Sequence, residues 1–168
     1  LSQSTFQYKL KEEQVVVSVS VNHHDSLQYG PWTLRGVISD RGETAAECIL
    51  PFNANGDYQQ KVDLVFDLPQ AKLWSPQEPF LYQLELVVTN KQGNTDQVQV
   101  PLGIRYSSGT PAGWLLNGES ITAKSQIITL NQEYQLRNSR QVENFLASVK
   151  NNGFNTVCFM GFFPDESW

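Results

Sequence analysis

The stretch LWSPQEPFLYQLELVV, residues 73–88, contains the two signals that decide the fold. Its first half, Leu73–Pro79, is a connection bounded by proline residues, which disfavour helix and mark a loop. Four apolar residues in its second half alternate with other residues, so they share one face of an extended chain: Tyr82, Leu84, Leu86 and Val88. The stretch therefore predicts a half-buried β-strand that is entered through a proline-rich connection.

The same period of two recurs on both sides of this stretch. Further strands are predicted within the runs 15–21, 32–38, 44–50, 62–68 and 98–102. Turn residues separate the runs at Asp40-Arg41-Gly42, Pro51–Asp57 and Asn90–Asn94. Six or seven short strands at this regular spacing, with no helical period, predict an antiparallel β-sandwich of the immunoglobulin type over residues 1–106.

The pattern changes after Tyr106, so residues 107–168 are predicted to form a second, small α/β segment. A linker at Ser107–Pro111 comes first. The pair Asn117-Gly118 then predicts a tight hairpin between Trp114–Leu116 and Ile121–Ile128, because both residues tolerate positive φ.

A helix over residues 139–152 follows from four apolar residues at helical spacing: Val142, Phe145, Leu146 and Val149. Asn138 or Ser139 would cap its start, and Gly153 stands where the residue after a helix often has positive φ. The apolar run that comes next predicts a buried strand over 154–160, and a helix followed by such a strand is half of a βαβ unit.

Composition excludes several functions. The chain has 168 residues, a net charge of −5 and no basic stripe, which argues against nucleic acid as a partner. No apolar run approaches the roughly 20 residues of a membrane span, and residues 1–4 do not resemble a signal peptide. Cys48 and Cys158 are expected to be two buried thiols, and no cofactor or metal is predicted. A complete (β/α)8 barrel needs about 250 residues, so a whole barrel enzyme is excluded.

Candidate catalytic groups are few, and each has a simpler interpretation. The cluster His23-His24-Asp25 is expected to be a polar loop, because adjacent strand residues point to opposite faces. The adjacent carboxylates Glu12-Glu13 and Asp165-Glu166 seldom reach the roughly 5–10 Å separation that a glycosidase needs. Three further carboxylates are interpreted as surface charges: Asp57, Asp63 and Asp67. We therefore predict no catalytic, cofactor-binding or metal-binding residues.

The four tryptophans could stack on sugar rings or pack in the structure. Trp32 alternates with its strand's core face and Trp74 lies in the proline-rich connection, so both are expected to pack in the core or at its edge. For Trp114 and Trp168 the sequence favours neither sugar stacking nor packing.

Residues 73–84 resemble the LWSP-x-x-P-x-LY-x-L signature of glycoside hydrolase family 2, which contains β-galactosidases, β-mannosidases and β-glucuronidases. The later motifs keep the order of that family. Gly103-Ile104-Arg105 is similar to its FGIR, Leu116-Asn117-Gly118 to its LNGKP hairpin, and Val149–Val157 to its first barrel helix and second strand. The resemblance implies an immunoglobulin-like domain followed by the start of a (β/α)8 barrel.

Three departures from the family pattern bear on function. Residues 123–128 lack the Asn and His of the family's KGVN-x-H stretch, Cys158 replaces its second-strand Arg, and Phe162 replaces the His of its HYP turn before Phe163-Pro164. The family's two catalytic glutamates lie near the ends of barrel strands four and seven, beyond the predicted strand over 154–160. The resemblance thus implies a non-catalytic accessory domain fragment of a β-galactosidase-like hydrolase, inactive alone.

The same resemblance implies the partners. These are the remaining domains of a parent chain, namely a sugar-binding domain and the catalytic barrel, with carbohydrate bound by the parent. The residues give no localisation, and by family analogy alone we expect the parent in the periplasm or outside the cell. The alternative is a stand-alone carbohydrate-binding or protein-interaction module with a degenerate barrel-like tail.

Overall fold

The computed structural model describes residues 1, 3–22, 30–54, 59–111, 113–133, 136 and 138–161. The chain divides into two compact units. The first comprises Leu1–Thr110 with Leu115–Glu119, and the second comprises Pro111–Trp114 with Ser120–Trp168. The domain boundary after Tyr106 stays a prediction.

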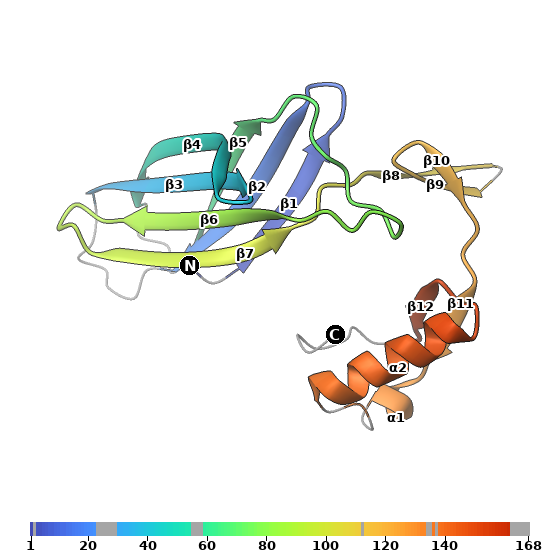
Figure 1. Ribbon diagram of the computed structural model, residues 1–168. Coiled ribbons are helices and arrows are strands. Elements are labelled where there is room, and N and C mark those ends of the chain that lie inside the picture. The colour runs from blue at the N-terminus through green and yellow to red at the C-terminus, as the bar shows by residue number, and fades with distance from the viewer. Residues whose placement is uncertain are drawn as a thin grey trace. The chain divides into compact units, whose positions relative to one another are not determined.

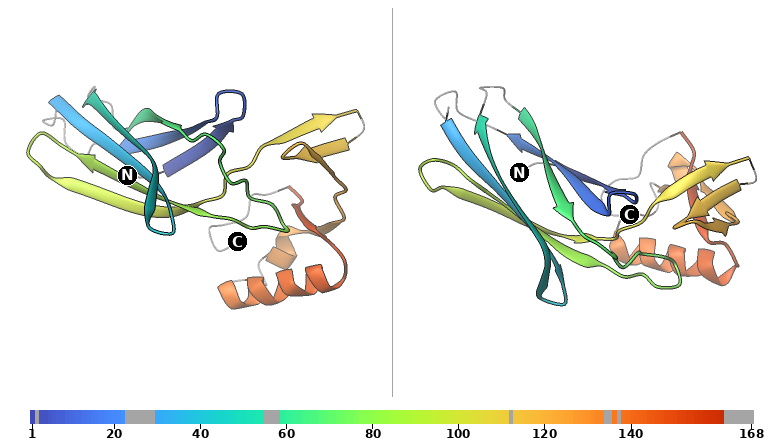
Figure 2. Two further views of the ribbon diagram at one scale, coloured as in Figure 1. Left: turned by 45° about the horizontal axis from the view of Figure 1, so that its top comes forward. Right: turned by 90° about the horizontal axis from the view of Figure 1, so that it is seen from above.

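The first unit is a β-sandwich of two antiparallel sheets (Figure 1). The three-stranded sheet has the order β1-β2-β5, and its strands are β1 (Gln3–Lys9), β2 (Gln14–Asn22) and β5 (Gln59–Asp67). The four-stranded sheet has the order β4-β3-β6-β7. Its strands are β3 (Gly30–Asp40), β4 (Glu43–Ala54), β6 (Tyr82–Thr89) and β7 (Thr95–Leu102). The views of Figure 2 show the sheets as two layers.

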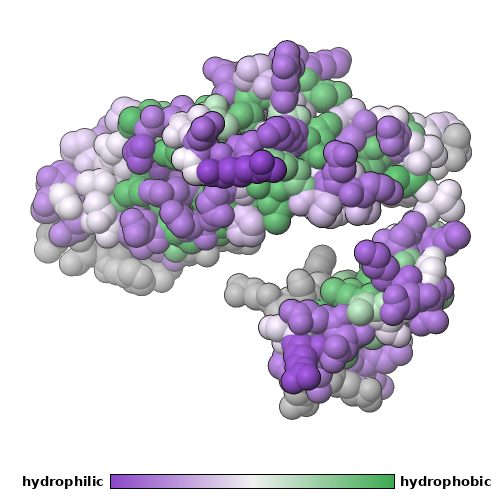
Figure 3. All heavy atoms as spheres, in the orientation of Figure 1, coloured by the Kyte–Doolittle hydropathy of each residue, from purple (hydrophilic) through white to green (hydrophobic). Residues whose placement is uncertain are grey.

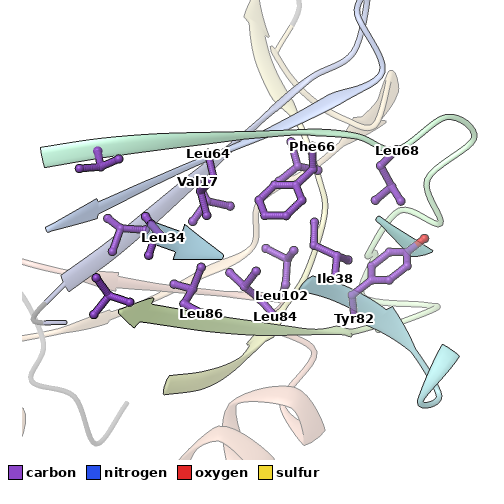
Figure 4. Close-up of a cluster of buried hydrophobic side chains, with 14 of the residues drawn as sticks. Val17, Leu34, Ile38, Leu64, Phe66, Leu68, Tyr82, Leu84, Leu86 and Leu102 are labelled. Carbon is purple, nitrogen blue, oxygen red and sulfur yellow. The ribbon is translucent and has the colours of Figure 1, made fainter. Parts of the chain in front are cut away.

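The core of the sandwich consists of the alternating apolar residues of both sheets. In β2 every second residue is buried, namely Val15, Val17, Val19 and Val21. Figure 4 shows one of these inward side chains, Val17, facing side chains of the other sheet, among them Leu34, Leu84 and Leu86. Burial of each such side chain contributes about 1.5–3 kcal/mol, so the core is the main source of stability. Figure 3 shows mostly hydrophilic residues over the visible face of the sandwich.

Two tight turns connect neighbouring strands of the larger sheet. Arg41 and Gly42 have φ of 51° and 89° between β3 and β4, which is the positive φ that a two-residue hairpin requires. Between β6 and β7, the side chain of the buried Asn90 accepts hydrogen bonds from the backbone N–H groups of Gln92 and Asn94. These turns follow the turn signals of the sequence, and the predicted mainly β, immunoglobulin-like fold class is confirmed.

A third sheet has the order β10-β9-β8, from β8 (Ser107–Thr110), β9 (Gly113–Leu116) and β10 (Glu119–Ile121). Asn117 and Gly118 link β9 to β10 with φ of 53° and 85°, as the Asn-Gly pair predicts. The run from Ile121 to Ile128 is not one hairpin arm, which corrects the prediction. It breaks after Ile121, because the Asn155 side chain hydrogen-bonds to Thr122 O (2.9 Å) and Lys124 N (2.8 Å).

The second unit contains a parallel strand pair. Strand β11 (Ser125–Ile128) pairs in parallel with β12 (Thr156–Phe159), and between them lie α1 (Leu130–Glu133) and α2 (Ser139–Asn151). Asn138 rather than Ser139 caps α2, since its side chain accepts from Gln141 N at 3.0 Å. Gly153 has φ of 80° just after the helix. Ile128, Val142 and Val149 are the buried apolar residues among those described in this unit.

Candidate functional site

The proline-rich connection between β5 and β6 is held at its start by Tyr82, the first residue of β6. The Tyr82 hydroxyl accepts a hydrogen bond from the Lys72 backbone N–H at 2.9 Å. The Phe80 ring meets the Tyr82 ring edge-on at 4.9 Å between centroids, and the Lys72 ammonium lies 4.9 Å from the Phe80 centroid. These contacts fix the path of the connection over the end of the sandwich.

A tight turn follows at residues 75–78. Ser75 N donates to Glu78 O at 2.9 Å, and the Ser75 hydroxyl accepts from Glu78 N at 3.0 Å. Proline at position 76 fixes φ in this turn and needs no hydrogen-bond acceptor. The serine and the prolines of the sequence signature thus have a structural role, because together they shape the loop that carries Trp74.

Trp74 is anchored to the segment that follows β7. Its backbone N–H donates to Ile104 O at 2.7 Å. Gly103 lies against the indole, since a Cβ at that position would be 3.4 Å from two indole carbons. The Arg105 guanidinium lies 5.3 Å from the Trp74 ring, within the range of a cation–π contact. The Gly-Ile-Arg motif therefore surrounds the tryptophan of the other motif.

Asn117 joins this cluster to the hairpin between β9 and β10. Its Nδ2 donates to Trp74 O at 2.9 Å, and its Oδ1 accepts from Tyr106 N at 3.2 Å. The Asn117 backbone N–H also donates to Tyr106 O at 2.9 Å. We call this cluster of Trp74, Arg105, Tyr106 and Asn117 the Trp74–Asn117 junction. It is the site to which three sequence motifs contribute, and all its residues lie in the first compact unit.

A cleft of about 330 Å³ borders the junction within the first unit. Its lining comes from β1, from Val15 of β2 and from the segment after β7, and includes Phe6, Tyr8, Arg105 and Tyr106. Burial raises the pKa of Tyr8 above 10.0, and the nearby negative charge of Glu13 raises it further, so the phenol stays protonated over a wider pH range.

The candidate carboxylates that the structure describes are all exposed. Glu12 and Glu13 lie exposed at the turn between β1 and β2. Asp63 and Asp67 lie on the outer face of β5, where they accept hydrogen bonds from Ser18 (2.6 Å) and Gln14 (2.8 Å). Four candidate stretches lie outside the described residues: His23-His24-Asp25, Asp57, Asp165-Glu166 and Phe162 to Pro164.

The tryptophans and cysteines differ in their burial. Trp32 is buried against the core, with its ring 6.3 Å from that of Phe52, whereas Trp114 is 60% exposed. Cys48 is half-buried and Cys158 is exposed, which corrects the expectation of two buried thiols. Cys158 is exposed because it pairs with the exposed Ile127 on the same face of the two-stranded β11–β12 sheet. Trp168 lies outside the described residues.

Within the part of the chain that is described, no group of three or more His, Cys, Asp or Glu residues could hold a metal ion. Nor do the described helices include one with the length and hydrophobicity to cross a membrane. Two features of the site are not apparent from the sequence, namely the side-chain hydrogen bonds of Asn117 and the cleft. The Asn-Gly pair signalled only a turn, and a cleft between distant segments leaves no local pattern.

The fold and the junction define a class of protein: an immunoglobulin-like sandwich clamped to the hairpin that precedes a parallel strand–helix–strand unit. The family model for glycosyl hydrolases family 2 matches residues 2–105, more than half of the chain. The chain therefore belongs to glycosyl hydrolases family 2, as the sequence motifs indicated. A search of curated proteins finds no match.

Solved structures of Bacteroides proteins share the fold. One is a glycosyl hydrolase family 2 member from Bacteroides cellulosilyticus, with TM-score 0.77 and 21% identity over 92% of this chain and 20% of that one. Another is a β-glucuronidase from Bacteroides uniformis, with TM-score 0.73 and 16% identity over 98% and 20%. A β-glycosidase from Bacteroides vulgatus has TM-score 0.67 and 19% identity over 98% and 21%. The chain spans about a fifth of each of these proteins.

Proposed function

We propose that this chain is the non-catalytic, immunoglobulin-like accessory domain of a longer glycoside hydrolase, together with the first elements of its catalytic barrel. Membership of the family and the low coverage of the similar solved structures support this proposal. The accessory role is to anchor the segment that leads from the sandwich into the barrel.

The observation that carries the proposal is the parallel pairing of β11 with β12 through α2. Parallel strands joined by a helix are the repeating unit of a (β/α)8 barrel, and strands of such a barrel have neighbours on both sides. One face of this pair carries the exposed side chains Ile127 (47%) and Cys158. The remaining barrel strands would cover that face, and they are the partner that we propose.

The Trp74–Asn117 junction supports the proposed accessory role. Its three hydrogen bonds tie Asn117, the turn residue of the hairpin, to both Trp74 and Tyr106. Glycosidases need two carboxyl groups about 5–10 Å apart across the sugar, which the adjacent Glu12 and Glu13 are poorly placed to supply. We therefore assign to this chain a positioning role and no hydrolysis of its own.

The test is a turnover assay of the full 168-residue chain with p-nitrophenyl β-D-galactoside, β-D-glucuronide and β-D-mannoside. We expect no release of nitrophenol above the uncatalysed rate. Turnover that disappears in Glu12→Gln or Glu13→Gln, but not in the matched surface variant Glu85→Gln, would overturn the accessory role.

A further inference from the structure

Arg105 at the cleft is a cation without a carboxylate partner among the described residues. Its one described hydrogen bond runs from Nη1 to Gly103 O at 3.5 Å, the outer limit of such a bond. A guanidinium carries five N–H donors in a planar fork that matches the geometry of a carboxylate. Most of these donors are open to a ligand.

The guanidinium is also held in place. It lies 5.3 Å from the Trp74 ring, and the Trp74 main chain is hydrogen-bonded at both its N–H, to Ile104, and its carbonyl, to Asn117. A side chain that is already ordered loses less conformational entropy when a ligand binds. The junction therefore prepares Arg105 for a bidentate contact.

An aromatic ring borders the same cleft. Phe6 pairs with the fully buried Val17 across β1 and β2, so its side chain lies on the inner face of the sheet. It is nevertheless 44% exposed, because β1 is the edge strand of its sheet. The Tyr8 and Tyr106 hydroxyls, which have no hydrogen-bond partner among the described residues, add polar groups to the lining.

We propose that this cleft binds an acidic saccharide, with Arg105 on its carboxylate and Phe6 against the apolar face of its ring. The volume of about 330 Å³ lies at the lower end of the range of small-ligand pockets, which favours one sugar unit over a polypeptide segment. The single cation among hydroxyl and aromatic groups matches one carboxylate on a hydroxylated ring. A net charge of −5 also disfavours binding of a polyanion.

The test is an NMR titration of the full chain with sodium D-glucuronate and sodium D-galacturonate. We expect saturable shifts of the backbone amides at residues 6–8 and 104–107, with a Kd on the order of 1 mM. Glucose, which has the ring without the carboxylate, and acetate, which has the carboxylate without the ring, should each bind at least about tenfold more weakly.

Variants locate the site. Arg105→Gln and Phe6→Ala should each weaken glucuronate binding about tenfold or more, whereas Lys91→Gln, which removes a cation from the exposed β6–β7 turn, should leave it unchanged. If Arg105→Gln does not fold, glucuronate binding is measured in Phe6→Ala and in Arg105→Lys, which keeps the charge but not the planar fork. Both should bind glucuronate more weakly than the wild-type chain. Three results would overturn the proposal: no shifts up to about 50 mM uronate, acetate binding as tightly as glucuronate, or unchanged binding in folded Arg105 and Phe6 variants.

Discussion

Gly36 shows how closely the two sheets of the sandwich pack at a single residue. A Cβ on Gly36 would lie 2.5 Å from Cζ of Phe66 and 2.8 Å from Cδ1 of Leu64. Both neighbours are fully buried, so neither can move away without disturbing the core.

We expect Gly36→Ala to lower the free energy of unfolding by about 1–3 kcal/mol, the usual cost of overpacking a core. Urea denaturation followed by tryptophan fluorescence measures it. Gly109→Ala is the matched control, because a Cβ there would have no neighbour within 4 Å. Equal stability of the two variants would show that the sheets do not meet as described.

Asn117 makes a prediction for the Trp74–Asn117 junction. Asn117→Ala removes the side-chain partners of Trp74 O and Tyr106 N and places alanine at a φ of 53°. Because half-buried backbone groups lose their hydrogen bonds, we expect a loss of about 1–3 kcal/mol in urea denaturation. Asn131→Ala is the matched control on the exposed α1. A loss no larger in Asn117→Ala than in this control would mean that the junction does not hold the hairpin.

The raised pKa of Tyr8 makes the free energy of unfolding depend on pH in the alkaline range. Its pKa is raised above 10.0 in the folded chain, so the folded state holds the phenol proton more tightly than the unfolded state. The stability from the neutral phenol is complete below about pH 10 and decreases as pH rises through the folded pKa.

Tyr8→Phe tests this dependence, because phenylalanine has no proton to lose. The urea midpoint of the wild-type chain should decrease more steeply between about pH 9.5 and 11.5 than that of the variant. Parallel curves for the two chains would contradict the raised pKa.

At the scale of the element, α2 depends on a cap. Asn138 is its cap, and no acidic residue lies in its first turn. Asn138→Ala should destabilise the helix by about 0.5–2 kcal/mol and increase the hydrogen-exchange rates of the amides at 142–151. Asn138→Asp, which keeps the acceptor and favours the helix dipole, should preserve their protection. Equal exchange in both variants would rule out the capping role.

Strands and turns of the sandwich could be predicted because their signals are local. Val15 to Val21 alternate within one strand, and Asn-Gly alone specifies the positive φ of a tight turn. The edge strand β1 could not be predicted in the same way. Its exposed Phe6 and the polar residues around it show no clear apolar alternation, and the strand is held by its pairing with β2. The break after Ile121 was missed for a similar reason: Asn155, which causes it, is more than 30 residues away.

At the scale of the whole molecule, the candidate site was only partly predictable. The motifs around Trp74, Arg105 and Asn117 were found as separate stretches, and their hydrogen bonds emerge only when the fold brings them together. The second unit has a small core of Ile128, Val142 and Val149 among its described residues, and it leaves Ile127, Leu146 and Met160 exposed. These exposed apolar side chains support the proposal that the unit is the start of a larger α/β layer.

The proposed function is tested by sequencing the coding region that follows the Trp168 codon. We expect further strand–helix units that continue the barrel, with an Asn-Glu pair at the end of its fourth strand and a Glu at the end of its seventh. A stop codon directly after Trp168, or a continuation without those glutamates, would contradict the proposed function and favour a stand-alone binding module.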